Sequence, residues 1–358
     1  MNPGLVEKIA DAVLYEGYIL YPYRPSAVKN QQRWNFGALC PQSYSVAQQG
    51  TEACEMKTEC LVQSRSETRL DLKVRFLHLL SREVGEVVAD CHLPIADCGH
   101  QLDGASGFHF VFVPSLEANG KLFQTWQEAV ERDVLLPAIN LNTAVSNPQR
   151  LWFTFPSTRQ VETLQNDDTG AMAGIILRTQ HAIEGTMEVT ATAVDADVTK
   201  ISVRILNLTP FADATRKSRD EALLRSFVST HTIMSARDGA FMSLLDPPEV
   251  LRAAASECSN VGTYPVLAGD EGATDCMLSS PIILYDYPQI APESAGALFD
   301  GTEIDEILTL RIMTLTEEEK REMRGADDRA RQILERTEML PPEQLMKMHG
   351  AMKGVNRK

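Results

Sequence analysis

Alternation of apolar and polar side chains in the middle of the chain is the feature that most constrains the fold. From Leu70 to His78, a row of mainly apolar side chains alternates with a row of mainly charged ones. Further strand-like runs follow at 108–113, 151–155, 174–179, 186–194 and 200–208. A period of two is typical of a strand with one buried face. A short connection that contains residues 195–197 joins the last two runs, so we expect them to pair as an antiparallel hairpin.

Helices are expected on both sides of these strands. Pro3 follows the capping residue Asn2, and apolar residues on one face predict a helix up to about Gly17. Apolar side chains that recur every four residues predict another helix over 121–136, which Pro137 ends.

The chain after residue 208 mixes helix and strand signals. Ser218 and Glu221 form a capping box that predicts a helix over 222–234. The segment 246–249 predicts the start of a short helix that ends at Ala255. The apolar run 281–285 indicates one more strand.

Together these elements predict an α+β fold with an antiparallel β-rich centre at about 69–208 and helical N- and C-terminal elaborations. The centre is either a sandwich or an open sheet. No internal repeat or low-complexity linker divides the chain, so we expect residues 1–315 to form a single body.

Residues 316–358 are expected to form a charged helical arm. Between 316 and 338 the chain carries eight acidic and six basic side chains and few apolar ones. Pairs of opposite charge at i,i+4 support an exposed helix by only a few tenths of a kcal/mol each. We therefore expect a projecting arm that docks on a partner or on a second copy of the chain.

The net charge restricts the partners that the chain can have. With 34 basic and 49 acidic side chains the formal charge is −15, which argues against nucleic-acid binding. No apolar run is long enough to cross a bilayer, and the N-terminal segment does not resemble a signal peptide, so we expect a cytoplasmic protein without membrane insertion. Residues 246–300 hold nine acidic side chains against one basic, which indicates either a solvated surface or a patch for a basic partner or a cation.

Potential metal ligands are densest between residues 91 and 100. Thiol and imidazole groups there are Cys91, His92, Cys98 and His100. They could supply a tetrahedral site, but their spacing matches no standard zinc motif, so we expect no metal and no other cofactor. The alternative of a loop with buried thiols and hydrogen-bonded imidazoles is favoured. The acidic segment 270–300 also lacks the spacing of an EF-hand.

Two tyrosine-rich segments are candidates for contact with a partner. The candidate residues are Tyr21, Tyr23, Arg24, Tyr285, Asp286, Tyr287 and Glu293. Tyrosine and arginine are favoured at interfaces, although the same residues also pack within a chain, and both alternatives stay open. We expect residues 21–25 to lie near residues 285–292.

Several long segments of the sequence, which we call phrases, resemble known proteins over their whole length. They are 15–30 with 33–37, 280–294 with 298–308, 315–324, and 244–248. In these phrases the chain resembles a family of bacterial proteins encoded in gene clusters for high-affinity, actinobacterial-type nickel-iron hydrogenases. The resemblance implies a role in assembly, maturation or structure, assigns no reaction, and carries over no catalytic residue.

Two functions remain open at this point. One is a non-catalytic accessory protein that binds a hydrogenase subunit or a maturation factor, alone or as a homo-oligomer. The other is a metal carrier or metal-dependent enzyme that uses the 91–100 cluster or the acidic 270–300 segment. No known catalytic motif is present, which favours the first.

The irregular spacing of the Cys and His residues at 91–100 leads to a testable prediction. Elemental analysis of the purified protein should find no stoichiometric zinc or iron, because the ligands are not spaced for a tetrahedral site. Stoichiometric metal that disappears on the substitution Cys98→Ser would contradict it.

Overall fold

Strand β2 (Arg69–Val88) is the spine of the fold. The computed structural model describes residues 3–15, 35–88, 109–167, 169–289, 312–326 and 328–341. In the first half of β2 the residues Leu70, Leu72, Val74 and Phe76 are buried, as the alternation predicts. The strand spans 20 residues, and it hydrogen-bonds to β12 and β6 in its first part and to β9 and β3 in its last part.

Two antiparallel sheets contain most of the strands. One has the order β13–β1–β11–β10–β7, from Ala240–Phe241, Glu55–Gln63, Val198–Asn207, Ile183–Ala193 and Gln149–Phe155. The other has the order β14–β15–β12–β2–β9–β8, in which β14 is Tyr264–Leu267, β15 is Cys276–Ser280, β12 is Val228–Arg237, β9 is Met172–Gln180 and β8 is Thr158–Gln165. Strands β3 (His109–Val113) and β6 (Trp126–Asn140) also pair with β2.

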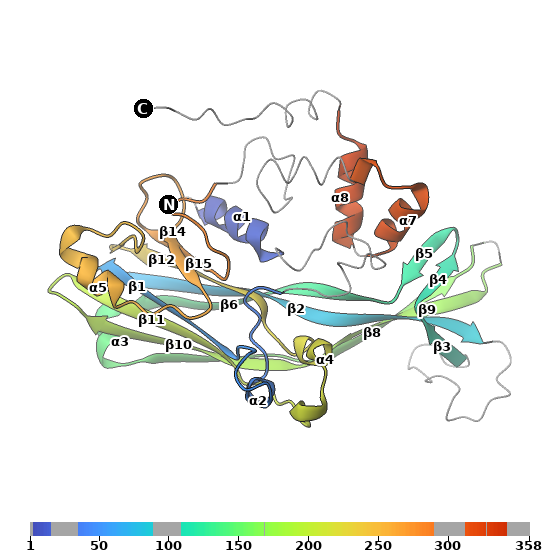
Figure 1. Cartoon of the computed structure of the whole chain (residues 1–358), viewed down its shortest axis with the longest axis horizontal. Helices are drawn as coiled ribbons and strands as arrows, with labels where there is room; N and C mark the ends of the chain where they lie inside the picture. The colour runs from blue at the N-terminus through green and yellow to red at the C-terminus, as the bar shows by residue number, and fades with distance from the viewer. Residues whose placement is uncertain are drawn as a thin grey trace.

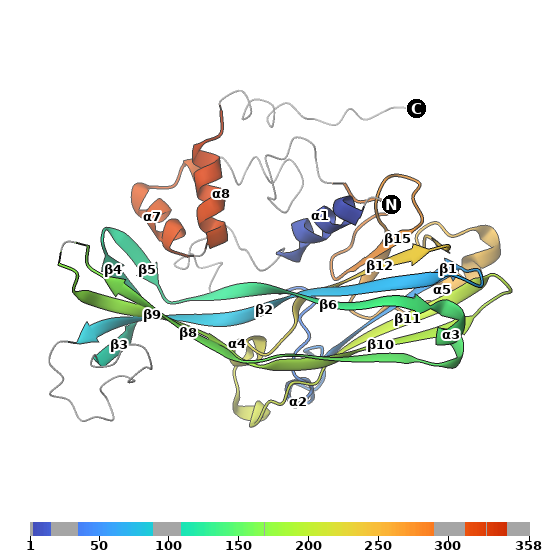
Figure 2. The same cartoon turned by 180° about the vertical axis from the view of Figure 1, so that it is seen from behind.

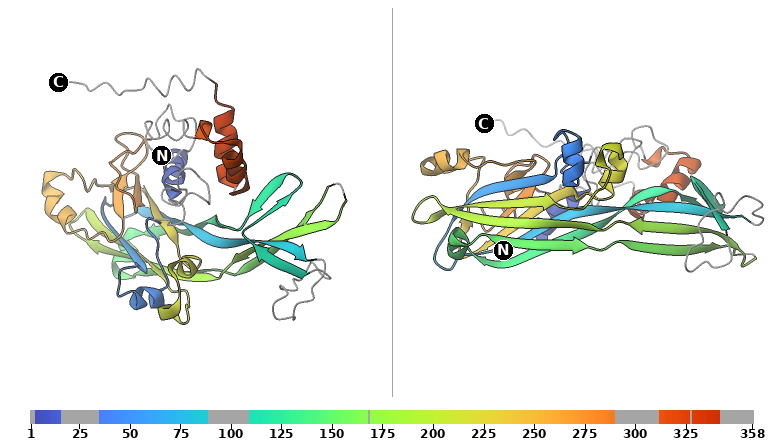
Figure 3. Two further views of the ribbon diagram at one scale, coloured as in Figure 1. Left: turned by 45° about the vertical axis from the view of Figure 1, so that its right-hand side comes forward. Right: turned by 90° about the horizontal axis from the view of Figure 1, so that it is seen from below.

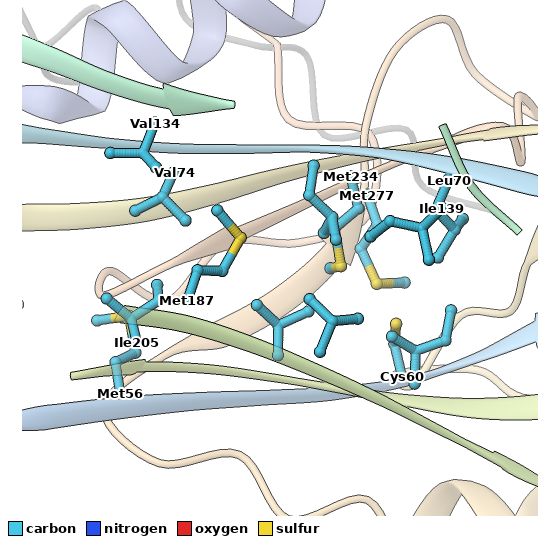
Figure 4. Packing of buried hydrophobic residues seen from close by; sticks show 14 of the residues in the cluster. Met56, Cys60, Leu70, Val74, Val134, Ile139, Met187, Ile205, Met234 and Met277 are labelled. Atoms are coloured by element: carbon cyan, nitrogen blue, oxygen red, sulfur yellow. The ribbon is translucent and has the colours of Figure 1, made fainter. Parts of the chain in front are cut away.

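The main core lies between these two sheets. Leu70 and Val74 of β2 and Met234 and Met277 of the neighbouring strands face Met187, Ile205 and Met56 of the other sheet (Figure 4). The thiol of Cys60 is buried in the same layer. The strands run along the long axis of the molecule (Figure 3). The two sheets share this core and form a sandwich over part of that length.

Beyond the sandwich the second sheet continues as an open sheet. There β2 pairs with β9 and β3, and a small core forms around Phe110, Ile175 and Leu177. The separate hairpin of β4 (Ser115–Ala118) and β5 (Lys121–Gln124) lies at this end (Figure 1).

Helices cover the outside of the sheets. α1 (Pro3–Leu14) packs Val6 and Ile9 on the outer face of β12 and β15, and α7 and α8 lie on the same side of the molecule (Figures 1 and 2). Lys73 of β2 forms an ion pair with Glu7 at 2.6 Å. The remaining short helices are α2 (Gln42–Ala47), α3 (Leu141–Ser146), η2 (Ala214–Arg216), α4 (Arg219–Leu223), η3 (Glu249–Leu251) and α5 (Arg252–Ser256).

The described part of the C-terminal arm is a pair of helices that contacts the body. α7 (Glu317–Ala326) and α8 (Asp328–Glu338) share a cluster that includes Met323, Ile333 and Leu334. The backbone oxygen of Gly325 accepts a hydrogen bond from Arg82 Nη2 at 2.6 Å, and Arg321 forms an ion pair with Glu117 of β4. The few apolar residues of the arm are therefore concentrated between its helices, and polar contacts connect it to the sheet.

The structure confirms the α+β class with an antiparallel β-rich centre and the hairpin of β10 and β11. Strands also occur outside residues 69–208, from Glu55 to Ser280.

The helix expected over 121–136 is wrong. These residues form β5 and β6, and β6 pairs with β2 from Trp126 opposite Arg82 to Asn140 opposite Arg69. Side chains four residues apart share a face in a strand as well as in a helix, because four is an even number. Pro137 lies at a bulge in this pairing, where the Asp71 carboxylate accepts a hydrogen bond from Ala138 N at 2.8 Å.

Two other expected elements also differ. The capping box of Ser218 and Glu221 is present, but α4 ends at Leu223 and residues 228–237 form β12 instead. β12 is rich in β-branched residues and bonds to strands on both edges, which outweighs the helix signal. The run 281–285 is not a strand, since Pro281 has no N–H to donate and Ile282 N bonds to Ser280 Oγ at 3.1 Å.

A substitution at Gly325 tests the contact between the arm and β5. Alanine in a helix interior is more favourable than glycine by up to about 1 kcal/mol, so Gly325→Ala should stabilise an isolated arm. In the structure a Cβ at this position overlaps the carbonyl oxygen of Leu122. We therefore expect Gly325→Ala to increase hydrogen exchange across 316–338 at least tenfold, whereas Glu318→Ala on the exposed face should not. Unchanged or slower exchange in Gly325→Ala would show that the arm does not dock on β5.

Candidate functional site

Most residues proposed from the sequence lie outside the described part of the chain. These are Tyr21, Tyr23, Arg24 and Glu293 of the partner-binding set and Cys91, His92, Cys98 and His100 of the metal set. The expected proximity of 21–25 to 285–292 and the state of the 91–100 loop therefore remain predictions.

Asp286 and Tyr287 are used within the chain. The Asp286 carboxylate accepts hydrogen bonds from Ser243 Oγ at 2.5 Å and from Leu267 N at 2.8 Å. Tyr287 N donates to Leu267 O at 2.7 Å, and its ring packs against the main core. Burial, together with the negative charge of Asp286, raises the pKa of Tyr287. These two half-buried residues make contacts within the chain, and their contact with a partner stays a prediction.

Tyr285 is available to a partner. Its side chain is 83% exposed, and Ile283 beside it is 70% exposed. Leu245 is 57% exposed and lies on the loop that Ser243 connects to the 283–287 segment by its hydrogen bond to Asp286. We refer to Leu245, Ile283 and Tyr285 as the Tyr285 surface.

The cysteines and acids of the described ranges do not form a metal site. No group of three or more His, Cys, Asp or Glu residues is arranged to hold an ion within those ranges. Cys40, Cys60 and Cys276 are buried as expected, and burial raises the pKa of Cys40 to about 11 and that of Cys276 to about 12. These thiols stay protonated at neutral pH, and they are poor ligands and poor nucleophiles.

One hydroxyl–imidazole pair resembles a catalytic dyad but is enclosed. Ser280 Oγ lies 3.1 Å from His231 Nε2, and His231 Nδ1 lies 2.7 Å from Ser229 O. A serine activated by a histidine needs access to a substrate. Both side chains are 0% exposed, so the pair contributes hydrogen bonds to the packing between β12 and β15.

A cleft between the arm and the sheet is the most distinctive site. It has a volume of about 820 Å³ and lies between α7 and α8 on one side and β2, β5, β8 and β9 on the other. Its basic lining residues are Arg82, Lys121, Arg178, Arg321, Arg324 and Arg331, and its acidic ones are Glu162, Glu317 and Glu335. We refer to this space as the arm cleft. Four of these basic side chains form ion pairs, Arg82 and Arg178 with Glu128, Arg321 with Glu117 and Arg324 with Glu338. Positive charge that an anionic ligand can use is therefore found at the rim of the cleft.

Glu128 of β6 organises the floor of the arm cleft. Arg82 and Arg178 lie directly opposite each other on β2 and β9, where two like charges repel. Glu128 Oε1 accepts from Arg82 at 2.9 Å, and its Oε2 accepts from Arg178 at 2.9 Å. Burial opposes the charge of Arg178, but Glu162 and Glu128 outweigh that effect and raise its pKa. The positive charges of the floor are therefore already compensated.

The rim of the arm cleft carries charge that a ligand can use. Lys121 is exposed and forms no ion pair with a described residue. Arg324 contacts Glu338 at 3.0 Å, and both are partly exposed. Exposed ion pairs contribute only about 0–1 kcal/mol, so a carboxylate of a ligand can replace Glu338 at little cost.

Sequence reasoning did not identify the arm cleft. The spacing of Arg321 and Arg324 on one helix was a visible signal. The contributions of Arg82 and Arg178 depend on the pairing of β2 with β9, which joins residues far apart in the chain.

Two comparisons with known proteins find no match. Neither protein-family models nor curated protein sequences match the chain. None of the helices in the described ranges has both the length and the apolar composition that crossing a bilayer requires.

The buried imidazoles predict how stability depends on pH. Burial lowers the pKa of His231 to about 4 and that of His78 to about 4, against about 6.5 in an unfolded chain. Between pH 6.5 and 4 the unfolded state binds more protons than the folded state. Each group therefore lowers the free energy of unfolding as the pH falls through this window, by up to roughly 3 kcal/mol.

The change in melting temperature between pH 7 and 5 measures this effect. We expect the drop to be smaller in His231→Gln than in the wild type. His109→Gln, at an exposed position of β3, should leave the drop unchanged. An equal drop in all three proteins would show that other groups control acid stability.

Proposed function

We propose that this chain is a cytoplasmic, non-catalytic accessory protein of a nickel-iron hydrogenase. In this proposal it binds an acidic segment of a hydrogenase subunit, or of a maturation factor, in the arm cleft. The choice of partner rests on the resemblance of the phrases at 15–37 and 280–308 to proteins from hydrogenase gene clusters.

The observation that carries the proposal is the basic lining of the arm cleft. Six basic side chains line it; four of them pair with carboxylates, whereas Lys121 is exposed and forms no ion pair with a described residue. The guanidinium group of arginine presents paired N–H donors that match the two oxygens of a carboxylate. The volume of about 820 Å³ falls in the range of roughly 300–1,000 Å³ that is typical of ligand clefts. An acidic polypeptide segment satisfies both the charge and the size.

The Tyr285 surface offers a second contact for the same partner. Tyrosine supplies a large contact area and one hydrogen-bonding group at low entropic cost. A non-catalytic role also agrees with the enclosure of the Ser280–His231 pair, which a substrate does not reach. The role of the arm is then to close one side of the cleft over the bound segment.

Affinity capture from the native host with charge-reversal variants tests this function. The wild-type chain should capture a hydrogenase subunit or maturation factor. Lys121→Glu with Arg331→Glu should capture at least tenfold less, because both substitutions place negative charge in the cleft. The control, Arg65→Glu with Arg252→Glu, makes the same change in net charge at exposed positions, and Arg252 belongs to α5 at the opposite end of the molecule (Figure 1).

Two results would overturn the proposal. One is the absence of any hydrogenase-related protein from the wild-type capture. The other is equal capture by the cleft variant and the control. Lys121→Glu alone, which breaks no ion pair of the described residues, gives the same comparison if the double variant unfolds.

A further inference from the structure

The outer face of the second sheet holds a pocket beside α1. It has a volume of about 230 Å³, its floor comes from β2, β6, β12 and β15, and α1 forms one wall. Figure 1 shows α1 above these strands, away from α7 and α8. We refer to this space as the α1 pocket. It shares no lining residue with the arm cleft, so the two sites are separate.

The register of the strands assembles the floor of the α1 pocket. On β2, Asp71 and Lys73 face outward, because the residues next to them in the strand point into the main core. Ile233 of β12 and Leu135 of β6 both lie opposite Lys73. Ser235 of β12 lies opposite Asp71. Residues opposite each other on neighbouring strands share a face, so these side chains meet on the outer side of the sheet.

The α1 pocket is apolar at its inner end and open at its outer end. Val6 of α1, Cys276 of β15 and Ile233 are 2%, 5% and 9% exposed and line the inner end. Burial raises the pKa of Cys276 to about 12, so its thiol is neutral. Leu135 also lines the pocket and is 59% exposed, which places the opening on the β6 side. A ligand therefore has both room and a route of entry.

The charged groups that line the α1 pocket are already paired within the chain. Lys73 Nζ lies 2.6 Å from a carboxylate oxygen of Glu7 and 3.7 Å from one of Asp133. Asp71 forms an ion pair with Arg237 at 2.7 Å. A charged ligand would lose its hydration here without finding an uncompensated partner, so the pocket favours a neutral one.

Ser235 is the one polar lining residue that a neutral ligand can use. Its side chain is half-buried, and its hydroxyl forms no hydrogen bond with a described residue. A hydroxyl both donates and accepts, so it can pair with a hydroxyl, carbonyl or amide of a ligand. Because its surroundings are largely apolar, such a bond fixes the orientation of the ligand.

We propose that the α1 pocket binds a small neutral molecule with a single aromatic ring and one hydrogen-bonding group. An apolar cavity of about 150 Å³ holds benzene, and clefts for drug-sized ligands begin at about 300 Å³. A volume of about 230 Å³ lies between them and suits one substituted ring. A rigid ring also loses less conformational freedom on binding than an alkyl chain of the same volume. The site does not depend on the proposed function.

Binding of 4-fluorophenol to the full-length protein, followed by fluorine NMR, tests the site. Saturable binding is expected for 4-fluorophenol and not for 4-fluorobenzoate, because the carboxylate finds no unpaired cation in the pocket. Ser235→Ala should weaken the affinity for 4-fluorophenol at least fivefold. It should leave the affinity for fluorobenzene, which has no hydroxyl, within twofold of the wild type.

Two further variants test the walls of the pocket, each with a matched control. Ser235→Phe fills the pocket and should abolish binding of both neutral probes, whereas Thr190→Phe places the same ring at an exposed position of β10 and should not. Leu135→Ala removes the apolar side chain at the opening and should weaken both probes at least threefold. Leu245→Ala, at a leucine of nearly equal exposure on the Tyr285 surface, should leave both affinities unchanged.

Three outcomes contradict the proposal. They are the absence of saturable 4-fluorophenol binding, equal binding by Ser235→Phe and the wild type, and binding of 4-fluorobenzoate as tight as that of 4-fluorophenol. The first would leave the pocket to an apolar side chain of a partner or of a second copy of the chain. If Ser235→Phe does not fold, the comparison of Leu135→Ala with Leu245→Ala decides, because both substitutions are at exposed positions.

Discussion

The rest of the structure depends on the pairing of β2 along both of its edges. Its first half carries the inner face of the sandwich, and its second half continues into the open sheet with β9 and β3. Because one strand belongs to both parts, the main core and the arm cleft are held in a fixed relation. Arg82 illustrates this: it belongs to β2, yet it donates hydrogen bonds to Gln124 O at the end of β5 and to Gly325 O of the arm.

The chain handles positive charge in two different ways. In the floor of the arm cleft, Glu128 lies between two arginines that the sheet places opposite each other, and Glu162 also pairs with Arg178, so both positive charges are compensated before any ligand arrives. Elsewhere, Arg132 and Arg225 face aromatic rings, a glutamine and a histidine instead.

The sequence predicted those elements in which local pattern and tertiary context agree. The alternation at 70–78 and the hairpin at 186–208 are present, and α1 begins where Pro3 indicates. The helix over 121–136 failed because a spacing of four fits both periods, and only the pairing with β2 decides between them. Of the candidate residues, Tyr285 is exposed, whereas Asp286 and Tyr287 form internal hydrogen bonds that no local pattern specifies. The arm cleft assembles from strands and helices distant in sequence, which explains why charge counts along the chain did not reveal it.

The shared strand also determines the order in which this chain can become stable during synthesis. β2 is complete at Val88, but its partners β9 and β12 end at Gln180 and Arg237. Until those residues leave the ribosome, the long strand exposes unpaired N–H and C=O groups and a row of apolar side chains, a combination that favours aggregation. Contacts between residues so distant in sequence also slow folding. The nascent chain is therefore vulnerable over much of its synthesis, and chaperones that shield exposed strands would act on it in that interval.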